Sequence, residues 1–292
     1  MTLARQSPIS FDELSDELNS RKPIFSWSFD DRDDHAVVEL GQSTTFNLSL
    51  TEPLSADFTR KAHANGRTVE PSVCLCLQAV IDLLNVETVL DIGAHYGFLT
   101  LFMAKQEKVK SVHSVEMNPD VVKILSANLD LNQDAQAKCT IHNVGVSDVD
   151  QAEQDIWYHG MRLLFEEPAN KGIPHTKLDI LTFNSLIKHI GETPDLIKID
   201  IEGFEAKLVS DLRTFDTSGK RPAIMLELHG EELLNRLGSK RTDIFDALFG
   251  QGYDCAMLHW HQHMPASGLV SQVTAENLGE KLAKPHGMYL FW

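Results

Sequence analysis

The chain has 292 residues, of which 42% are hydrophobic and 23% charged, and its formal net charge is −16 at pH 7. These values predict a globular protein with one large core and an appendage. The acidic balance, without any Lys/Arg-rich run, argues against a protein that binds nucleic acid or an anionic membrane surface. A positively charged cofactor would instead meet a favourable electric field.

The first residues, M-T-L-A-R-Q-S-P-I-S, contain no apolar stretch typical of a signal peptide, and no later run is long enough to span a bilayer. We therefore expect a cytoplasmic protein without a membrane span. The cysteines lack the paired C-x-x-C spacing of a zinc site. We expect them to be reduced and mostly buried: Cys74, Cys76, Cys139 and Cys255.

Residues 1–65 are predicted to form a small N-terminal extension of one helix and a β-hairpin. The helix is expected over residues 11–19, and strand-like runs follow at residues 24–29, 35–40 and 44–50. The two candidate roles of this extension are a lid over the main domain and a contact in a homodimer.

Residues 66–292 are predicted to form the main domain, because apolar runs of strand length alternate there with amphipathic helices. The seven expected strands are residues 88–92, 111–115, 139–146, 196–201, 223–228, 253–260 and 288–292. This alternation predicts an α/β, Rossmann-like fold with a doubly wound, mostly parallel sheet of seven strands. A polar insertion at about residues 149–179 interrupts the alternation. Ligands of such sheets bind beyond the carboxyl ends of the strands.

The first of these strands leads into D-I-G-A-H-Y-G, which places Gly93 and Gly97 in the turn before a helix. Glycine lets the backbone approach a ligand closely. Glu116, in V-E-M-N-P, stands at the end of the second strand, where its carboxylate can accept hydrogen bonds from both hydroxyls of a ribose. Together these residues predict a nucleoside site.

S-adenosylmethionine is favoured over a nicotinamide dinucleotide as the ligand of this site. The turn G-A-H-Y-G departs from the pattern G-x-G-x-x-G that seats a pyrophosphate on a helix N-terminus. Asp91, just before the turn, would repel that anion, whereas an ammonium and sulfonium cofactor tolerates it. Asp91 could also serve only to orient the turn through backbone N–H groups.

Three segments of the chain resemble the FkbM-type methyltransferases: L-D-I-G-A-H-Y-G, then V-E-M-N-P with A-N-L-D-L-N, and D-L-I-K-I-D-I-E-G-F-E. The resemblance covers roughly residues 66–292. It implies a class I methyltransferase fold with an antiparallel last strand, S-adenosylmethionine as the cofactor, and O-methylation of a small molecule, natural product or glycan. The chain departs from the family at His95, where Asn is usual, and at Gly145, where Ala is commoner.

The resemblance also implies which residues contact the cofactor. The expected contacts are Asp91, Gly93, Ala94, His95, Gly97, Glu116, Met117, Asn118, Val144, Gly145, Ser147 and Asp200. Glu70, in G-R-T-V-E, is expected near the polar end of the cofactor. The alternative is that Glu70 is a surface acid or a helix start signal.

The fourth and fifth strands of the main domain end in K-I-D-I-E-G and L-E-L-H-G. Residues two apart on a strand share a face, so Asp200 with Glu202, and Glu227 with His229, are predicted to point into the cleft as catalytic residues. Transfer to an alcohol needs a base or a metal to remove the acceptor's proton. His229 is the predicted base, because its ordinary pKa is nearest to neutrality. Asp200 and Glu227 are candidate ligands of a divalent cation such as Mg²⁺.

Each of these assignments has a structural alternative. His229 could be a packing residue that bonds a carbonyl group. Glu202 and Gly203 could simply form the turn between strand and helix, with Glu202 or Glu205 favouring the helix N-terminus. Lys198 is expected to point to the opposite face of the strand from its neighbours and is interpreted as structural.

Two further functions stay open beside methyl transfer. The run H-W-H-Q-H would place His259, His261 and His263 on one face of a strand, a spacing that could bind a transition metal, as in a metal protein or iron oxygenase. Its place at the cleft rim makes contacts with a substrate the favoured interpretation. The other alternative is a protein that binds S-adenosylmethionine without transferring its methyl group.

The insertion contains aromatic and basic residues that could stack on a sugar or clamp an acid. These residues are Trp157, Tyr158, His159 and Arg162. Equally, Trp157 and Phe165 could only fill the core of a hairpin.

Overall fold

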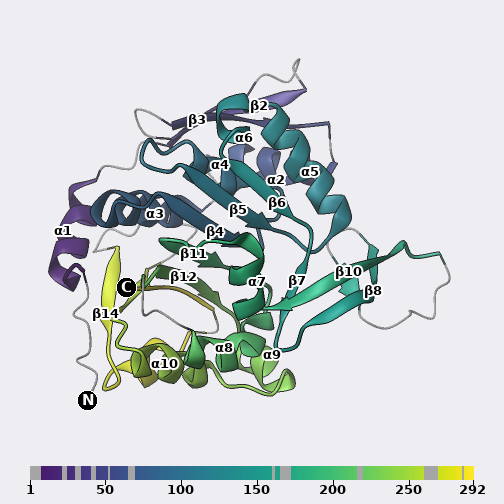
Figure 1. Cartoon of the computed structure of the whole chain (residues 1–292). Helices are drawn as coiled ribbons and strands as arrows, with labels where there is room; N and C mark the ends of the chain where they lie inside the picture. The colour runs from purple at the N-terminus through teal and green to yellow at the C-terminus, as the bar shows by residue number, and fades with distance from the viewer. Residues whose placement is uncertain are drawn as a thin grey trace.

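The computed structural model of the chain describes residues 8–21, 25–29, 34–40, 44–51, 53–64, 70–159, 162–164, 172–215, 220–259, 269–284 and 286–292. These residues form a central sheet with helices on both faces, an N-terminal sheet packed on one side and an insertion sheet at another (Figure 1).

Eight strands make up the central sheet within the described residues, in the order β14-β13-β15-β12-β11-β4-β5-β6. Their bounds are β4 (Thr88–Ile92), β5 (Ser111–Val115), β6 (Cys139–His142), β11 (Leu196–Ile199), β12 (Ala223–Leu228), β13 (Cys255–Leu258), β14 (Val270–Val273) and β15 (Gly287–Phe291). The strands from β6 to β12 pair in parallel, whereas β15 is antiparallel to both of its neighbours. The predicted doubly wound α/β fold is thus confirmed, and β14 adds an edge strand to the predicted seven.

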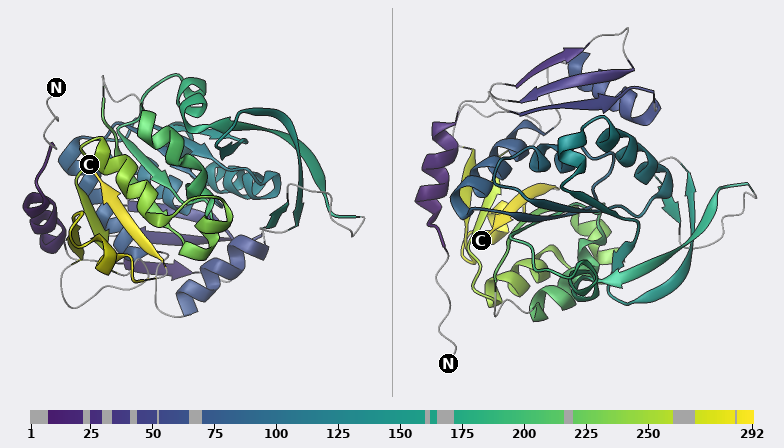
Figure 2. Two further views of the ribbon diagram at one scale, coloured as in Figure 1. Left: turned by 90° about the horizontal axis from the view of Figure 1, so that it is seen from below. Right: turned by 45° about the horizontal axis from the view of Figure 1, so that its top comes forward.

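Helices cover the two faces of this sheet (Figure 2). One face carries α3 (Pro71–Leu84), α4 (Phe98–Ala104) and α5 (Pro119–Asp130), and the other carries α7 (Phe183–Ile190), α8 (Val209–Thr214) and α10 (Arg241–Gly250). The shorter helices are α6 (Gln133–Gln136), η1 (Phe204–Leu208), α9 (Glu231–Arg236) and α11 (Leu278–Lys281). No helix among the described residues combines the length and apolarity that crossing a membrane requires.

Alternate residues of each strand feed two separate hydrophobic cores. In β4, Val89 packs in the core under α3 and α4, whereas Leu90 and Ile92 pack in the core under α7, α8 and α10. Burial on both faces explains why the strands are apolar along their whole length.

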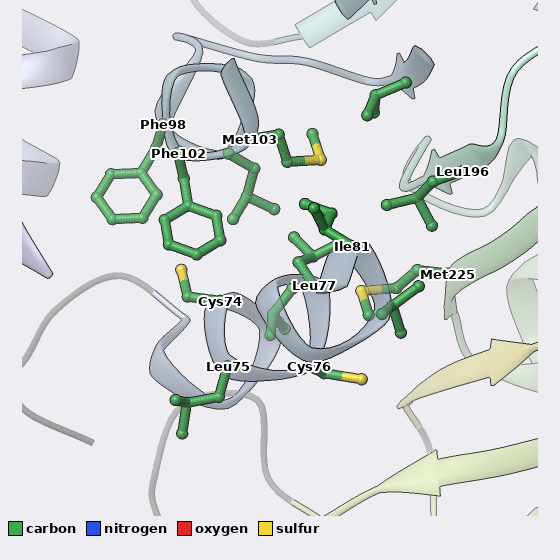
Figure 3. Close-up of a cluster of buried hydrophobic side chains, with 14 of the residues drawn as sticks. Cys74, Leu75, Cys76, Leu77, Ile81, Phe98, Phe102, Met103, Leu196 and Met225 are labelled. Carbon is green, nitrogen blue, oxygen red and sulfur yellow. The ribbon is translucent and has the colours of Figure 1, made fainter. Parts of the chain in front are cut away.

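The core under α3 is shown in Figure 3, where side chains of α3 and α4 meet the strands. Leu77 projects from α3, and Phe102 and Met103 project from α4, into the cluster that also contains Met225 of the sheet. Burying each such side chain stabilises the fold by about 1.5–3 kcal/mol. As expected, the cysteines are free thiols, and all except the half-buried Cys139 are buried.

The N-terminal extension is built as α1 (Phe11–Ser20), β1 (Phe25–Phe29), β2 (His35–Leu40), β3 (Thr44–Ser49) and α2 (Pro53–Ala64). Its strands form a three-stranded antiparallel sheet and not only a hairpin, because β2 pairs with both β1 and β3. Strand β3 packs against α4 and α5. Phe46 meets Phe98 edge to face, with ring centroids 5.3 Å apart. The extension and the main domain therefore share one hydrophobic core.

Asn128 of α5 links β3 to the glycine turn that follows β4. Its Oδ1 accepts the backbone N–H of Ser49 at 2.7 Å, and its Nδ2 donates to the carbonyl of Tyr96 at 2.7 Å. Both bonds are buried, and Asn132 adds two further bonds to the backbone of Asn47, so polar contacts as well as apolar packing position the extension.

The insertion forms a sheet of its own, in the order β7-β10-β8-β9. Its strands are β7 (Gly145–Ser147), β8 (Gln151–His159), β9 (Arg162–Leu164) and β10 (His175–Thr182). The single strand predicted over residues 139–146 is wrong, because β6 belongs to the central sheet and β7 to the insertion. The insertion sheet therefore starts directly beside the carboxyl end of β6 and extends away from the body (Figure 1).

Candidate functional site

A cavity of about 720 Å³ opens beyond the carboxyl ends of β4, β5, β11 and β12. Its size is typical of small-molecule sites, and β4 and β11 flank the point where the winding of the sheet reverses. Most of the predicted site residues line it: Glu70, Gly93, Ala94, His95, Glu116, Met117, Asn118, Val144, Gly145, Ser147, Asp200, Glu202 and Glu227.

The glycine turn after β4 has the backbone conformation that its sequence requires. Gly93 has φ +82°, and a Cβ there would lie 1.8 Å from the carbonyl oxygen of Asp200. Gly97 has φ +88°, and its Cβ would lie 2.3 Å from Leu125 Cδ1. His95, between them, has φ 52°. Asn and His tolerate this left-handed region better than other non-glycine residues, which accounts for His at a position where Asn is usual.

The second departure from the family pattern, Gly145, also has a steric cause. A Cβ at this position would lie 2.5 Å from Ile180 Cδ1 and 3.0 Å from Met117 Sδ. Because β10 packs so closely on β7, alanine would push these side chains toward the cavity.

Glu116 is fixed at the end of β5 by two backbone bonds. Its Oε2 accepts from the N–H of His95 at 3.0 Å, and its Oε1 accepts from the N–H of Asn118 at 2.8 Å. Burial raises the pKa of Glu116, against the effect of these two bonds. Each carboxylate oxygen keeps acceptor capacity for a ligand hydroxyl.

Three carboxylates converge on the other side of the cavity. Oxygen atoms of Glu70, Asp200 and Glu227 all lie within 4.8 Å of one another. Burial, with the neighbouring acids, raises the pKa of Glu70 to about 7 and that of Glu227 to about 8. A cation bound here would favour the ionised carboxylates.

Lys198 is a site residue that the sequence interpretation missed. Strand alternation does turn it away from Ile197 and Ile199, but toward the same face as Asp91, its neighbour in register on β4. Its Nζ donates to the carbonyl of Gly93 at 3.0 Å and lies 3.6 Å from Asp200 Oδ2. Burial opposes its charge, but the adjacent carboxylates hold the pKa of Lys198 above its usual value. The sequence signal that could have identified Lys198 is its position opposite Asp91 on the adjacent parallel strand.

Asp91 does not line the cavity, and its predicted contact with the cofactor stays a prediction. It is fully buried beneath the turn, where its Oδ2 accepts from Thr100 Oγ1 at 2.7 Å. Its Oδ1 makes no hydrogen bond and lies 3.5 Å from Lys198 Nζ. Asp91 therefore acts on the cavity through the charge of Lys198. Gly97 likewise lies outside the lining.

The expectation that Asp200 and Glu202 share a strand face is wrong, because β11 ends at Ile199. Glu202 and Gly203 form a turn with φ 54° and 98°, as the structural alternative proposed. Both side chains line the cavity, Asp200 from the end of β11 and Glu202 from the turn that follows it.

His229 follows the end of β12 and lies outside the cavity lining. Its Nδ1 is 3.1 Å from Glu205 Oε1, and its Nε2 is 3.4 Å from Glu202 Oε2. Burial lowers the pKa of His229, but the two carboxylates outweigh it and raise the pKa to about 10. His229 does not line the cavity, and its two ring nitrogens face Glu205 and Glu202, so its role as general base stays a prediction. Glu227 does line the cavity.

Of the histidine run, His259 follows β13, while His261 and His263 lie outside the described residues. From the insertion, Gln151 and Gln154 of β8 line the cavity, and Trp157 lies further along the strand against His175. Nothing is described of the side chains of His159 and Arg162, and Phe165 lies outside the described residues. The metal and sugar hypotheses for these segments stay predictions.

Comparison with known families matches residues 91–255 to the methyltransferase FkbM domain. No curated protein matches the chain. Among solved structures, the methyltransferase domain of bacterial CtHen1 is 13% identical, with 77% of this chain and 99% of that chain covered and a TM-score of 0.42. Fibrillarin from Aeropyrum pernix, solved with natively bound S-adenosyl-L-methionine, is 14% identical, with 93% and 99% covered and a TM-score of 0.40.

Proposed function

This chain belongs to the FkbM family of methyltransferases, and from that membership we propose that it transfers the methyl group of S-adenosylmethionine to a hydroxyl group of a small molecule, natural product or glycan. The observation that supports the proposal best is the composition of one cavity, in which a glycine turn, a ribose-binding acid and a cluster of carboxylates meet.

The cavity fits the cofactor in two places. Glu116, held by two backbone bonds, is the acceptor for the ribose hydroxyls, with Met117 and Val144 bordering the base. Glu70 and Asp200 form the acidic end, where the ammonium of the methionine moiety would be held. A dinucleotide would place its pyrophosphate among acids, which disfavours it.

The chemistry needs alignment and removal of one proton. When bound, S-adenosylmethionine supplies a methyl group activated by the sulfonium. As the new C–O bond forms and the C–S bond breaks, the hydroxyl proton passes to a carboxylate, for which Glu227 is the candidate, with Asp200 beside it. The raised pKa of Glu227, about 8, suits a base that operates near neutral pH.

A divalent cation on Asp200 and Glu227 is the alternative way to activate the acceptor. Their oxygens, with those of Glu70, are close enough for such an ion, and carboxylates are the ligands Mg²⁺ prefers. The Lys198 ammonium, 3.6 Å from Asp200, favours neutralisation without a metal. We therefore expect EDTA to leave activity intact, and loss of activity that Mg²⁺ restores would reverse this assignment.

The test combines calorimetry with a transfer assay. S-adenosylhomocysteine should bind, and methyl-labelled S-adenosylmethionine incubated with a panel of sugars and of hydroxyl, amino and thiol compounds should yield a methyl ether. Label found only on nitrogen or sulfur would refute the oxygen assignment. Cofactor binding without transfer to any panel member would favour a binding protein without transferase activity.

A further inference from the structure

Glu205, the second residue of η1, is a fully buried carboxylate with three partners. Its Oε1 accepts from the backbone N–H groups of Ile201 and Gly203, both at 3.2 Å, and lies 3.1 Å from Nδ1 of His229. One carboxylate thus joins the turn after β11 to the residue after β12.

Glu202 stands at the apex of that turn in a costly conformation. Its φ of 54° lies in the left-handed region, which costs a residue with a Cβ about 1–2 kcal/mol. Gly203, with φ 98°, is packed so closely that a Cβ would lie 2.2 Å from Leu233 Cδ2. Strain of this kind persists where the surroundings impose it, and it is concentrated at functional sites.

The conformation presents the carboxylate of Glu202 to the cavity. Its side chain is 85% exposed, yet Oε2 lies 3.4 Å from Nε2 of His229. The imidazole therefore lies between a buried carboxylate and an exposed one.

We propose that Glu205 and His229 are positioning residues, which together hold the Glu202 carboxylate at the cavity as the group that binds the methyl acceptor. The inference rests on the proposed transfer reaction and assigns its acceptor side. A carboxylate there selects acceptors that offer a hydroxyl or ammonium donor and disfavours anionic ones.

Charged groups from several neighbouring elements surround His229 and support this arrangement. Glu202 comes from the turn, Glu205 from η1, and Asp200 and Glu227 from the ends of β11 and β12; His286, before β15, meets the ring edge to face at 5.5 Å. The carboxylates of Asp200, Glu202 and Glu205 outweigh the one neighbouring imidazole and favour the imidazolium. The same contact with His229 lowers the pKa of Glu202, so this carboxylate is ionised at neutral pH.

The first test is the protonation state of His229, followed by NMR of the ¹⁵N-histidine-labelled protein and assigned by the signal missing in His229→Gln. We expect the ring to stay protonated up to at least about pH 8.5, and its midpoint to fall by more than about one pH unit in Glu205→Gln, a tenfold change in acid dissociation. Glu192→Gln is the control, because Glu192 bonds another histidine, His113, at 2.9 Å. A wild-type midpoint near 6.5, or one unchanged in Glu205→Gln, would overturn the proposal.

The second test separates positioning from cofactor binding. Affinity for S-adenosylhomocysteine should be unchanged in Glu202→Gln, Glu205→Gln and His229→Gln, while methyl transfer to the acceptor found in the panel should fall at least tenfold. The Glu205 and His229 substitutions should not be additive, because they break one unit. Glu205→Asp should recover part of the activity.

Outcomes of this second test separate the two hypotheses. Absence of S-adenosylhomocysteine binding in the wild type would refute the proposed function itself. Intact transfer in Glu202→Gln would refute only the acceptor assignment. Stoichiometric Mn²⁺ or Zn²⁺ that is lost in His229→Gln would also overturn it, since Asp200, Glu205 and His229 would then be metal ligands.

Discussion

The carbonyl oxygen of Asp200 occupies the space in which residue 93 would carry a side chain, because a Cβ on Gly93 would lie 1.8 Å from it. This contact joins the turn after β4 to the end of β11, the two neighbouring strands at which the winding of the sheet reverses. The glycine turn after β4 and the backbone of Asp200 are therefore fixed relative to each other by close packing.

Gly93→Ala is predicted to abolish S-adenosylhomocysteine binding and to destabilise the fold strongly. Gly191→Ala is a matched control, because Gly191 has φ +80°, close to the +82° of Gly93, but open space around its Cβ. Both substitutions carry the strain of about 1–2 kcal/mol for a left-handed residue, and only the first adds the clash. Urea unfolding and calorimetry would measure the difference, and equal losses in the two variants would contradict it.

Glu116→Gln is predicted to weaken binding of S-adenosylhomocysteine by about 10- to 100-fold, because hydrogen bonds to a charged carboxylate contribute about 1.5–3 kcal/mol each. Glu87→Gln serves as the control, since Glu87 precedes β4 at the opposite end of the sheet and pairs with Lys110. Unchanged affinity in Glu116→Gln, measured by calorimetry, would remove the ribose assignment.

Affinity for S-adenosylmethionine is predicted to rise between about pH 6 and 8.5. Glu70 and Glu227, with pKa values of about 7 and 8, lose protons in this range, and a cationic ligand favours the ionised forms. S-adenosylhomocysteine lacks the sulfonium charge and should show a shallower dependence. Glu70→Gln should reduce the slope for both ligands, because both carry the ammonium group, and an unchanged slope in this variant would argue against the acidic end of the site.

The contribution of Glu70 to the stability of the unliganded protein is predicted to fall as the pH rises from about 5 to 7. The pKa of Glu70 is raised to about 7 in the folded state, so the folded protein binds this proton more tightly than the unfolded chain does. Glu70→Gln should therefore have little effect near pH 5 and should raise the melting temperature relative to wild type near pH 7. His229, whose pKa is raised to about 10, adds its own loss of stability only above about pH 6.5. A difference in melting temperature between Glu70→Gln and wild type that does not change with pH would contradict this prediction.

Asn128→Ala is predicted to cost about 1–3 kcal/mol for each buried partner left without a bond, namely the N–H of Ser49 and the carbonyl of Tyr96. Asn19→Ala removes only an exposed bond to Ser15 and should change the free energy of unfolding by less than about 0.5 kcal/mol. Urea unfolding of the two variants measures the loss of free energy of unfolding in each. A small effect of Asn128→Ala would mean that the extension is held mainly by apolar packing and by the bonds between Asn132 and Asn47.

Sequence patterns predicted the strands around the cofactor turn because their signals are local. The glycines after β4 and the acid after β5 each follow a short apolar run, and the runs form parallel neighbours in register. Helices α2, α7 and α10 were not predicted. In α10, apolar residues are buried around much of the helix, so no clear amphipathic period is present.

The sequence by itself determined the fold class and the family, since each depends on residues close together in the chain. Only the tertiary structure decided that Lys198 faces Asp91 and that Asp91 lies beneath the cavity. It also decided that His229 lies between Glu202 and Glu205. The physical reason is that protonation and accessibility depend on burial and on charges from several strands, which no local pattern records. The Gly93 turn was visible in the sequence, but the Asp200 carbonyl that requires it was not.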